Sequence, residues 1–439
     1  MEHLQVRHIR ALISLVGALA LGCGEEAPAP TTAIEEPETT SPEDVQIPEE
    51  TASMLEALGY AERAPTDNPE EQGVTTRGDD AADGLNLFSS RDRAVALLTD
   101  LEGEVVHTWQ TTGAGRAWMH VEPLQDGSLL AITKDRDLAL HAWDSSVLWR
   151  TRLRAHHDLA RRADGSMLVL VRGPGTMDIA GHSTVVLTDE VVEVGADGEV
   201  GAHHPLLPLF AEDVSAYRRG RITAMHAAEG RRAVLRPGGI GDALHTNSIA
   251  VLEEDIEGIA PAGSILLSFR ATSRIAIVDA DFEEVLFRWG RGELEGQHDA
   301  TPLEGGNLLM FDNGNRRSAS RAIELDPRSG TIVWSYEAEG LYSQLRGGAQ
   351  RLSTGNVLIT EADSGHAIEV SREGEVVWEF WNPDVRTGES GAPERANLYR
   401  LNRFPRSFFA PLGESSEREH PPRSDRQGQM AATPGSSDG

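Results

Sequence analysis

Histidines recur in this sequence at one place within a repeated pattern. His157 lies eight residues before the glycine of a turn, Gly165, and His298 lies eight residues before a second turn glycine, Gly306. His245 opens the equivalent segment of the repeat between them, which has a longer turn. A lone histidine would most simply be structural, but three at related positions of a repeat can meet in one site. Imidazole is neutral near pH 7, so it can act there as a nucleophile, an acid or a base.

Side chains near these histidines in the sequence suit an anion. Arg270 ends an apolar strand of the fourth repeat, and Arg321 holds a related place in the fifth. The neutral donors nearby are Thr246, Asn247 and Asn313. Guanidinium, imidazole and amide groups that face one channel would hold a tetrahedral oxyanion.

Metal binding is the competing interpretation of a histidine cluster. The neighbouring arginine disfavours a cation, and the sequence has no His-x-His or His-Glu-x-x-His spacing. It also has no P-loop, no GxGxxG and no Gly-x-Ser-x-Gly motif. We therefore expect neither a metal nor another cofactor. His156, and the segment from Glu361 to His366, are weaker candidates for the site.

Glycine-bearing turns separate short apolar strands along most of the chain. Six units can be read, each with a turn and an apolar strand followed by outer strands rich in valine or tryptophan. The six turn-and-strand pieces cover residues 86–98, 125–130, 163–168, 262–267, 305–309 and 354–358. No helical period is sustained, so the sequence predicts an all-β fold, a six-bladed β-propeller over residues 84–412. Five or seven blades stay open, because residues 397–401 could add a strand to the first unit.

The innermost strands of a propeller line its central channel, so equivalent positions of different repeats meet near the axis. This predicts that the three histidines surround one channel mouth. Residues 201–242 interrupt the third and fourth units, and this insertion is either a functional loop or a surface excursion.

The two ends of the chain differ in composition from its middle. Residues 24–83 carry 17 acidic and 2 basic side chains, which is half of the net charge of −30. Because they contain few large apolar residues, we expect residues 24–83 to be a disordered acidic linker and residues 413–439 to be a disordered tail. A nucleic-acid partner is not expected, since a phosphate binder needs a basic stripe.

The first 23 residues resemble the signal of a bacterial lipoprotein. Arg7 and Arg10 precede an apolar run from Ala11 to Leu21, and Cys23 is the only cysteine in the chain. The run is too short to span a membrane and suits the core of an export signal. We expect residues 1–23 to be a signal peptide, with Cys23 lipidated. The protein would then be exported and anchored to a membrane, in the periplasm or at the cell surface.

The segments around the histidines resemble the bacterial arylsulfate sulfotransferase family. The resemblance is carried by His245–Ser248, Ser268–Arg270, Gln297–Ala300, Phe311–Gly314 and Ser320–Ala322. It implies a six-bladed propeller that moves a sulfuryl group from an aryl sulfate donor to a phenolic acceptor without a nucleotide. It also implies that His298 becomes transiently sulfated, with His157, His245, Asn247 and Arg270 around the sulfate.

Two departures and two alternatives accompany this resemblance. Enterobacterial members carry a separate N-terminal β-domain and a disulfide, whereas this chain has an acidic lead and a single cysteine. One alternative is a non-catalytic propeller lipoprotein that binds an anionic ligand or a protein partner. The other is a hydrolase that passes the group to water.

Overall fold

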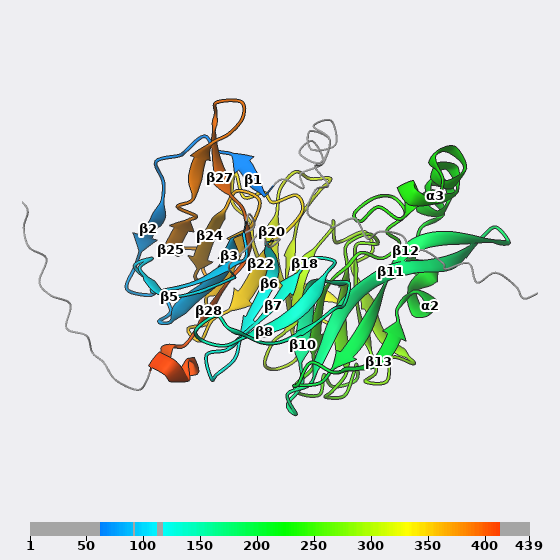
Figure 1. Ribbon diagram of the computed structural model, residues 1–439, viewed down its shortest axis with the longest axis horizontal. Coiled ribbons are helices and arrows are strands. Elements are labelled where there is room, and N and C mark those ends of the chain that lie inside the picture. The colour runs from blue at the N-terminus through cyan, green and yellow to red at the C-terminus, as the bar shows by residue number, and fades with distance from the viewer. Residues whose placement is uncertain (1–61, 91–92, 112–116, 413–439) are drawn as a thin grey trace, which may run out of the picture. The chain divides into compact units, whose positions relative to one another are not determined.

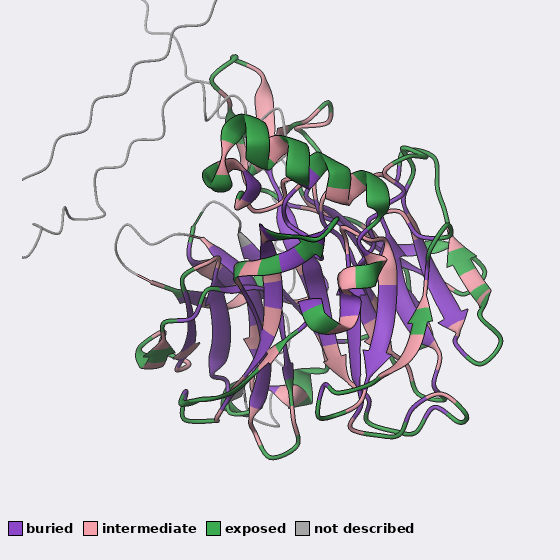
Figure 2. Ribbon diagram, turned by 90° about the vertical axis from the view of Figure 1, so that its right-hand side faces the viewer, coloured by how far each residue is buried: buried purple, intermediate pink, exposed green. Residues whose placement is uncertain are grey.

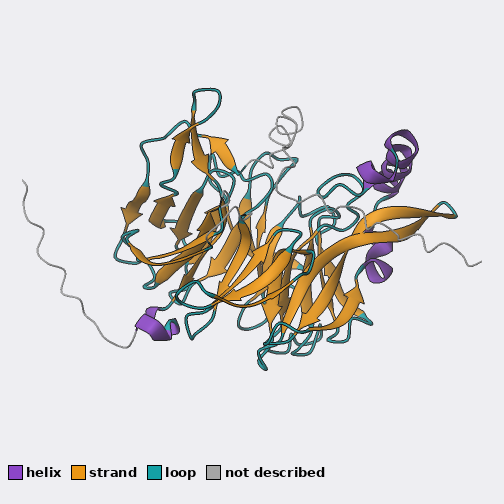
Figure 3. Ribbon diagram, in the orientation of Figure 1, coloured by secondary structure: helices purple, strands orange, loops and turns teal. Residues whose placement is uncertain are grey.

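The computed structural model describes residues 62–90, 93–111 and 117–412. The predicted signal peptide with Cys23, the linker up to residue 61 and the tail 413–439 lie outside these residues. Within the described part, the chain is all-β apart from one helical insertion and short helical turns (Figure 3).

Six antiparallel sheets of four or five strands follow one another along the chain (Figure 1), and we number them in that order. Sheet 1 contains β28 (Leu398–Phe404), β3 (Leu85–Ser90), β4 (Val95–Thr99) and β5 (Val105–Gln110). Sheet 2 contains β6 (Trp118–Pro123), β7 (Leu129–Thr133), β8 (Asp137–His141) and β9 (Val147–Thr151). Sheet 3 contains β10 (Ala155–Arg161), β11 (Met167–Ile179), β12 (His182–Val194) and β13 (Val200–Pro205). Sheet 4 contains β14 (Thr246–Val251), β15 (Ile265–Phe269), β16 (Arg274–Val278) and β17 (Val285–Trp289). Sheet 5 contains β18 (His298–Pro302), β19 (Leu308–Asp312), β20 (Arg321–Asp326) and β21 (Thr331–Tyr336). Sheet 6 contains β22 (Gly348–Arg351), β23 (Val357–Glu361), β24 (His366–Val370), β25 (Val376–Trp381) and β2 (Gly73–Arg77).

The core lies between the faces of successive sheets. The second strands β7, β15, β19 and β23 are buried at every residue, whereas the outer strands β9 and β21 are largely exposed or half-buried (Figure 2). Each apolar cluster joins two consecutive sheets. Leu266 of sheet 4, for example, packs in one cluster with Met310 of sheet 5. The cluster with Phe88 of sheet 1 and Phe380 of sheet 6 joins the last sheet to the first.

Sheet 1 is built from both ends of the described chain. β28 pairs with β3, with Leu401 opposite Phe88, so the segment predicted as a possible extra strand of the first unit does occupy that place. The short turns η3 (Arg406–Phe408) and η4 (Ala410–Leu412) follow it. This pairing ties the last described part of the chain to the beginning of the sheets.

The acidic linker ends earlier than the sequence predicted. β2 pairs with β25, and β1 (Arg63–Pro65) joins β27 (Pro393–Ala396) and β26 (Val385–Thr387) in a small sheet. The expectation of disorder through residue 83 is therefore wrong for residues 62–83. Backbone pairing to a sheet edge needs few apolar side chains. Buried Arg395 also donates hydrogen bonds to the carbonyl oxygens of Asn68 and Glu71.

The insertion of residues 201–242 is ordered and mainly helical. After β13 it forms α2 (Leu207–Phe210), η2 (Ala211–Asp213), α3 (Ala216–Glu229) and α4 (Arg231–Val234), which lie beside the long hairpin of β11 and β12 (Figure 1). The sequence did not predict α3, because Ile222 is its one buried residue and it has no apolar stripe. Ser215 caps its first turn by accepting a hydrogen bond from the backbone N–H of Arg218. None of the helices in the described residues is long and apolar enough to cross a membrane.

Candidate active site

The predicted histidines lie where three neighbouring inner strands begin. His157 is in β10, His245 directly precedes β14 and His298 is the first residue of β18. Each strand shifts register at this point, and the backbone is left-handed at His157 (φ 57°), His245 (φ 52°) and Asp299 (φ 56°). A left-handed residue other than glycine costs about 1–3 kcal/mol, so it persists only where its surroundings hold it. Bulges also redirect the neighbouring side chains, which accounts for the convergence of histidines from separate sheets.

A small cavity of about 30 Å³ lies at these strand starts. Its polar walls include His157 and His245, whose ring centroids are 4.9 Å apart, together with Arg270, whereas His298 is not among the lining residues. The other lining residues are Met119, Lys134, Arg172, Pro237, Gly238, Leu345 and Arg346. A water molecule needs about 10–15 Å³, so the cavity has room for a small group and not for an aromatic ring. Pro237 and Gly238 come from the insertion, which is therefore part of the site.

One ring nitrogen of His298 has a hydrogen-bond partner, and the other has none among the described residues. Its Nδ1–H donates to Oδ1 of Asn313 at 2.7 Å, and Asn313 is itself oriented because its Nδ2 donates to the carbonyl oxygens of Ser343 and Arg346 at 2.7 and 2.8 Å. Nε2 of His298 has no hydrogen-bond partner among the described residues. Burial, and after it the charge of Arg270, hold the pKa of His298 well below 6.5. The ring is therefore neutral at pH 7, with its lone pair on Nε2.

His245 is oriented by a carboxylate that precedes it in the loop. Its Nδ1–H donates to Oδ2 of Asp242 at 2.8 Å, and the backbone N–H of Gly238 donates to the same oxygen. Burial alone would raise the pKa of Asp242, but His245 beside it lowers that pKa far below the usual range. Arg218 of α3 holds this loop by donating to the carbonyl oxygens of Gly239 and Asp242. The helical insertion thus fixes the position of His245.

Three of the four cations that line the cavity share one spacing that the sequence interpretation missed. Arg270 lies seven residues after its turn glycine Gly263, and Lys134, Arg172 and Asn313 lie seven residues after Gly127, Gly165 and Gly306. Arg172 is buried, with Nε 2.6 Å from Oδ1 of Asp135, while its Nη2 has no partner among the described residues. The same test that related His157 to His298 would have found Lys134 and Arg172. It also shows that Asn313, and not Arg321, is the counterpart of Arg270 in the fifth repeat.

Three residues predicted to bind substrate have other partners. The hydroxyl and backbone N–H of Thr246 donate to Oδ2 of Asp189. Arg321 pairs with buried Asp312 at 3.0 Å and does not line the cavity. Asn247 is fully buried, and its Nδ2 donates to the carbonyl oxygen of Gln297 at 2.7 Å. The fourth, Asn313, uses its amide to orient His298.

The aspartates that follow two of the histidines connect neighbouring sheets. Arg400 of β28 lies 3.0 Å from Oδ1 of Asp158 and 3.2 Å from Oδ1 of Asp299. The other carboxylate oxygens accept the backbone N–H groups of Ile249 and Ala349 on the next inner strands. Burial alone would lower the pKa of Arg400, but the two carboxylates raise it. This cluster fixes the strand starts against one another.

The family comparison supports an activity for the whole chain. The family model described as arylsulfotransferase (ASST) matches residues 95–383, which is more than half of the chain and includes all of the cavity residues. The chain belongs to the arylsulfotransferase family. The resemblance predicted from the sequence is thereby confirmed, and an aryl sulfotransferase activity in general is supported. No curated protein matches the chain.

Solved structures with a similar course of the chain are distant from this arylsulfotransferase. A protein of unknown function from Bacteroides caccae is 15% identical, with a TM-score of 0.47, over 73% of this chain and 99% of its own. A streptogramin B lyase is 10% identical, with a TM-score of 0.43, over 78% and 97%. The Dos1 propeller is 8% identical, with a TM-score of 0.37, over 73% and 77%. These likenesses carry no argument about the reaction.

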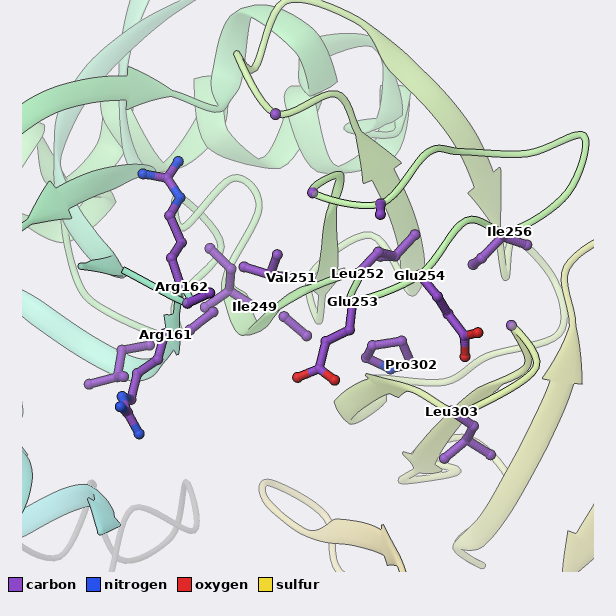
Figure 4. Close-up of a pocket in the computed structure, with 18 of the residues that line it drawn as sticks. Arg161, Arg162, Ile249, Val251, Leu252, Glu253, Glu254, Ile256, Pro302 and Leu303 are labelled. Carbon is purple, nitrogen blue, oxygen red and sulfur yellow. The ribbon is translucent and has the colours of Figure 1, made fainter. Parts of the chain in front are cut away.

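A much larger groove, of about 1520 Å³, lies at the other ends of the same three strands. It is lined by the last residues of β10, β14 and β18, which are Arg161, Val251 and Pro302. Figure 4 shows Arg161 on one side of it and the carboxylate of Glu253 on another. Because the histidines stand at the opposite strand ends, this groove is separate from the small cavity.

Proposed function

We propose that this protein transfers a sulfuryl group from an aryl sulfate to a phenol through a sulfohistidine on His298. The observation that carries the proposal is the state of His298, a neutral ring whose Nδ1–H is held by Asn313 and whose Nε2 is unpartnered among the described residues. A bare imidazole nitrogen beside a guanidinium is a nucleophile matched to an anionic sulfur centre.

In the first half-reaction, Nε2 of His298 attacks the sulfur of the donor and the bond from sulfur to the aryl oxygen breaks. The electron pair of that bond leaves with the phenolate. Arg270 and the ring of His245 line the cavity that suits the sulfuryl oxygens, and they stabilise the charge that shifts onto them. The aromatic ring extends toward the rim, because the cavity is too small for it.

In the second half-reaction, the oxygen of the acceptor phenol attacks the same sulfur and the bond from sulfur to Nε2 breaks. His157 lines the cavity and removes the phenol proton, which it then releases to solvent, while the phenolate of the first half-reaction takes its proton from solvent. A phenol and an aryl sulfate are consumed, a new phenol and a new aryl sulfate are formed, and His298 is regenerated. No cofactor takes part in this scheme.

The proposal is tested with a chromogenic aryl sulfate, with and without an added phenol. We expect chromophore release that depends on the phenol, and one added SO3 group on the peptide that contains His298 after mixing with the donor alone. His298→Asn should abolish both, and His157→Gln should slow transfer by about 100-fold or more. His141→Asn is the matched control, since His141 is also fully buried but lies in β8, away from the cavity. Release into water alone, or label on another histidine, would refute the assignment.

We further propose that the six sheets are the blades of a closed propeller. The first strands contact one another in the cyclic order β28, β6, β10, β14, β18, β22 and back to β28. The apolar cluster between sheet 6 and sheet 1 supports the same closure. A closed ring would bring the strand starts of different sheets to one channel mouth.

We also propose that the protein is an exported lipoprotein held at a membrane by Cys23. The proposal rests on the short apolar run before this single cysteine. A lipoprotein cysteine carries enough acyl chain for stable anchoring, because two chains suffice. The acidic residues that follow would separate the enzyme from the membrane surface.

A further inference from the structure

We propose that Asp189 and His156 are positioning residues that make His157 the proton-transfer group of the site. Together the three form a chain that we call the histidine relay, from Asp189 through His156 to His157. This inference rests on the proposed function, in which His157 takes the proton of the acceptor phenol.

The contacts of the relay assign its hydrogens. Nδ1 of His156 is hydrogen-bonded to Nδ1 of His157 at 2.6 Å. Nε2 of His156 is 3.2 Å from Oδ1 of Asp189, an ion-pair distance, and neither of these two atoms makes a hydrogen bond among the described residues. A carboxylate oxygen faces the protonated nitrogen of a ring, since it would repel a lone pair. His156 is fully buried, and burial lowers its pKa, so the neutral ring carries a single hydrogen, on Nε2. Its Nδ1 must then accept the Nδ1–H of His157.

This arrangement leaves Nε2 of His157 as a bare lone pair. His157 lines the cavity, and its Nδ1 is already bonded to His156. Nε2 is therefore the nitrogen available to a ligand, and it can accept a proton from a phenol bound there. Asp189, on strand β12, therefore sets the tautomer of His157 through His156, which lies between them in the relay.

Asp189 is itself held in place. Its other oxygen, Oδ2, accepts the backbone N–H of Thr246 at 2.7 Å and the hydroxyl of Thr246 at 2.9 Å. Asp189 and His156 have exposures of 1% and 0%, so no solvent competes for these contacts. The relay thus connects β12, β10 and the start of β14, the strand next to His245.

The relay also balances the charges that face His157. Burial is the main cause that holds the pKa of His157 well below 6.5, and the neighbouring rings and cations add to it. The groups that act on His157 are His156 on the same strand, His245 before β14, Arg172 of β11 and Lys134 after β7. An imidazolium at this place is costly unless a carboxylate offsets it. Asp189 provides that offset through His156, so His157 can hold the proton of the acceptor phenol briefly and release it to solvent.

The test separates the two half-reactions in the full chain, with 4-nitrophenyl sulfate as the donor and unsubstituted phenol as the acceptor. We expect Asp189→Asn and His156→Gln to retain the burst of nitrophenolate that accompanies sulfation of His298, because that step needs no proton. Transfer to phenol should slow by about 100-fold in both variants. In both variants the rate of transfer to phenol should also rise about tenfold per pH unit as the phenol ionises, whereas the wild-type rate should not change with pH. A purely structural role would not change this pH profile.

The matched control is His141→Gln, which removes an equally buried histidine that does not line the cavity. It should keep the burst, the rate of transfer to phenol and the flat profile. Should the relay variants fold poorly, ¹⁵N NMR of histidine-labelled wild-type protein can show which ring nitrogen of His157 carries the hydrogen. The His157 signals are assigned with the His157→Gln variant. We expect the hydrogen of His157 on Nδ1.

Two results would overturn the relay. One is a variant with an intact burst, a wild-type rate to phenol and a flat pH profile. The other is a hydrogen on Nε2 of His157 in the wild-type protein. A wild-type protein without any burst would instead refute the sulfohistidine mechanism, and the NMR result would still judge the hydrogen positions of the relay.

Discussion

Asn313 carries the sharpest prediction, because one side chain both supports the fold and selects the reactive tautomer of His298. Asn313→Ala removes three buried hydrogen bonds, to Nδ1–H of His298 and to the carbonyl oxygens of Ser343 and Arg346. Each buried group left without a partner costs about 1–3 kcal/mol. The carbonyl of Ser343 retains a weak contact with the hydroxyl of Ser320 at 3.4 Å, and water can enter the space. We therefore expect a loss of about 2–5 kcal/mol.

For a domain of this size, an unfolding entropy of about 2.1 cal/mol/K per residue converts that loss into a drop in Tm of about 3–7 °C. The catalytic effect is separate. Without Asn313, the tautomer with hydrogen on Nδ1 loses its preference of about 1–3 kcal/mol, so sulfation of His298 should slow by about 5- to 150-fold. Stopped-flow release of nitrophenolate measures this step, and differential scanning calorimetry measures Tm.

Asn356→Ala is the matched control. Asn356 is also buried, and its Nδ2 donates to the carbonyl oxygen of Asp80 and to Oε1 of Glu369, in sheet 6 and away from the cavity. We expect a comparable drop in Tm with the sulfation rate kept at 25 °C. Equal losses of rate in both variants would show that Asn313 acts only through stability, and an unchanged rate in Asn313→Ala would refute the tautomer argument.

Three further predictions concern other parts of the chain. Burial alone would lower the pKa of His366, but its hydrogen bonds to Glu361 and Glu379 raise this pKa above 6.5. The hydrogen bond from His366 is also the main cause that lowers the pKa of Glu379 to about 2. The contribution of His366 is lost as pH rises through its raised pKa, and that of Glu379 as pH falls toward 2. The difference in Tm between wild type and His366→Gln should therefore be largest between pH 4.5 and 6.5, and a constant difference would contradict this. Deleting residues 24–61 should leave Tm nearly unchanged. Deleting residues 24–80 should lower Tm, because this deletion also removes β1 and β2. Equal Tm values for the two deletions would show that these strands add no stability. Cys23→Ser should move the protein from the membrane fraction to the soluble fraction, and unchanged membrane association would refute the anchor.

The repeat pattern makes the fold class and the main histidines predictable from the sequence. Turn glycines and short apolar strands recur at regular places along the chain, and both can be recognised from local sequence. Counting from those glycines relates His157 to His298 through the spacing of residues alone. The same counting, extended seven residues beyond each glycine, would have included Lys134 and Arg172.

Elements held by backbone pairing were not predictable in this way. β2 lies within the segment predicted to be the acidic linker, and it is held by pairing with β25, a strand about three hundred residues later. The sequence left the role of the insertion open because α3 buries only Ile222. Its importance comes from Arg218, whose contacts with the loop before His245 join residues that no local pattern connects.

Residue type and repeat position are properties of the chain, so the amino-acid sequence alone related His157 to His298 and predicted that His245 lies near them. The role of each of them depends instead on contacts made in the folded protein. Asn313 and Thr246 were both predicted to bind substrate, and in the structure the amide of Asn313 accepts from His298 while the hydroxyl of Thr246 donates to Asp189. The physical reason is that a hydrogen-bond donor has a role only through its partner. The partners here lie on different strands, so folding sets the tautomer and charge of each histidine.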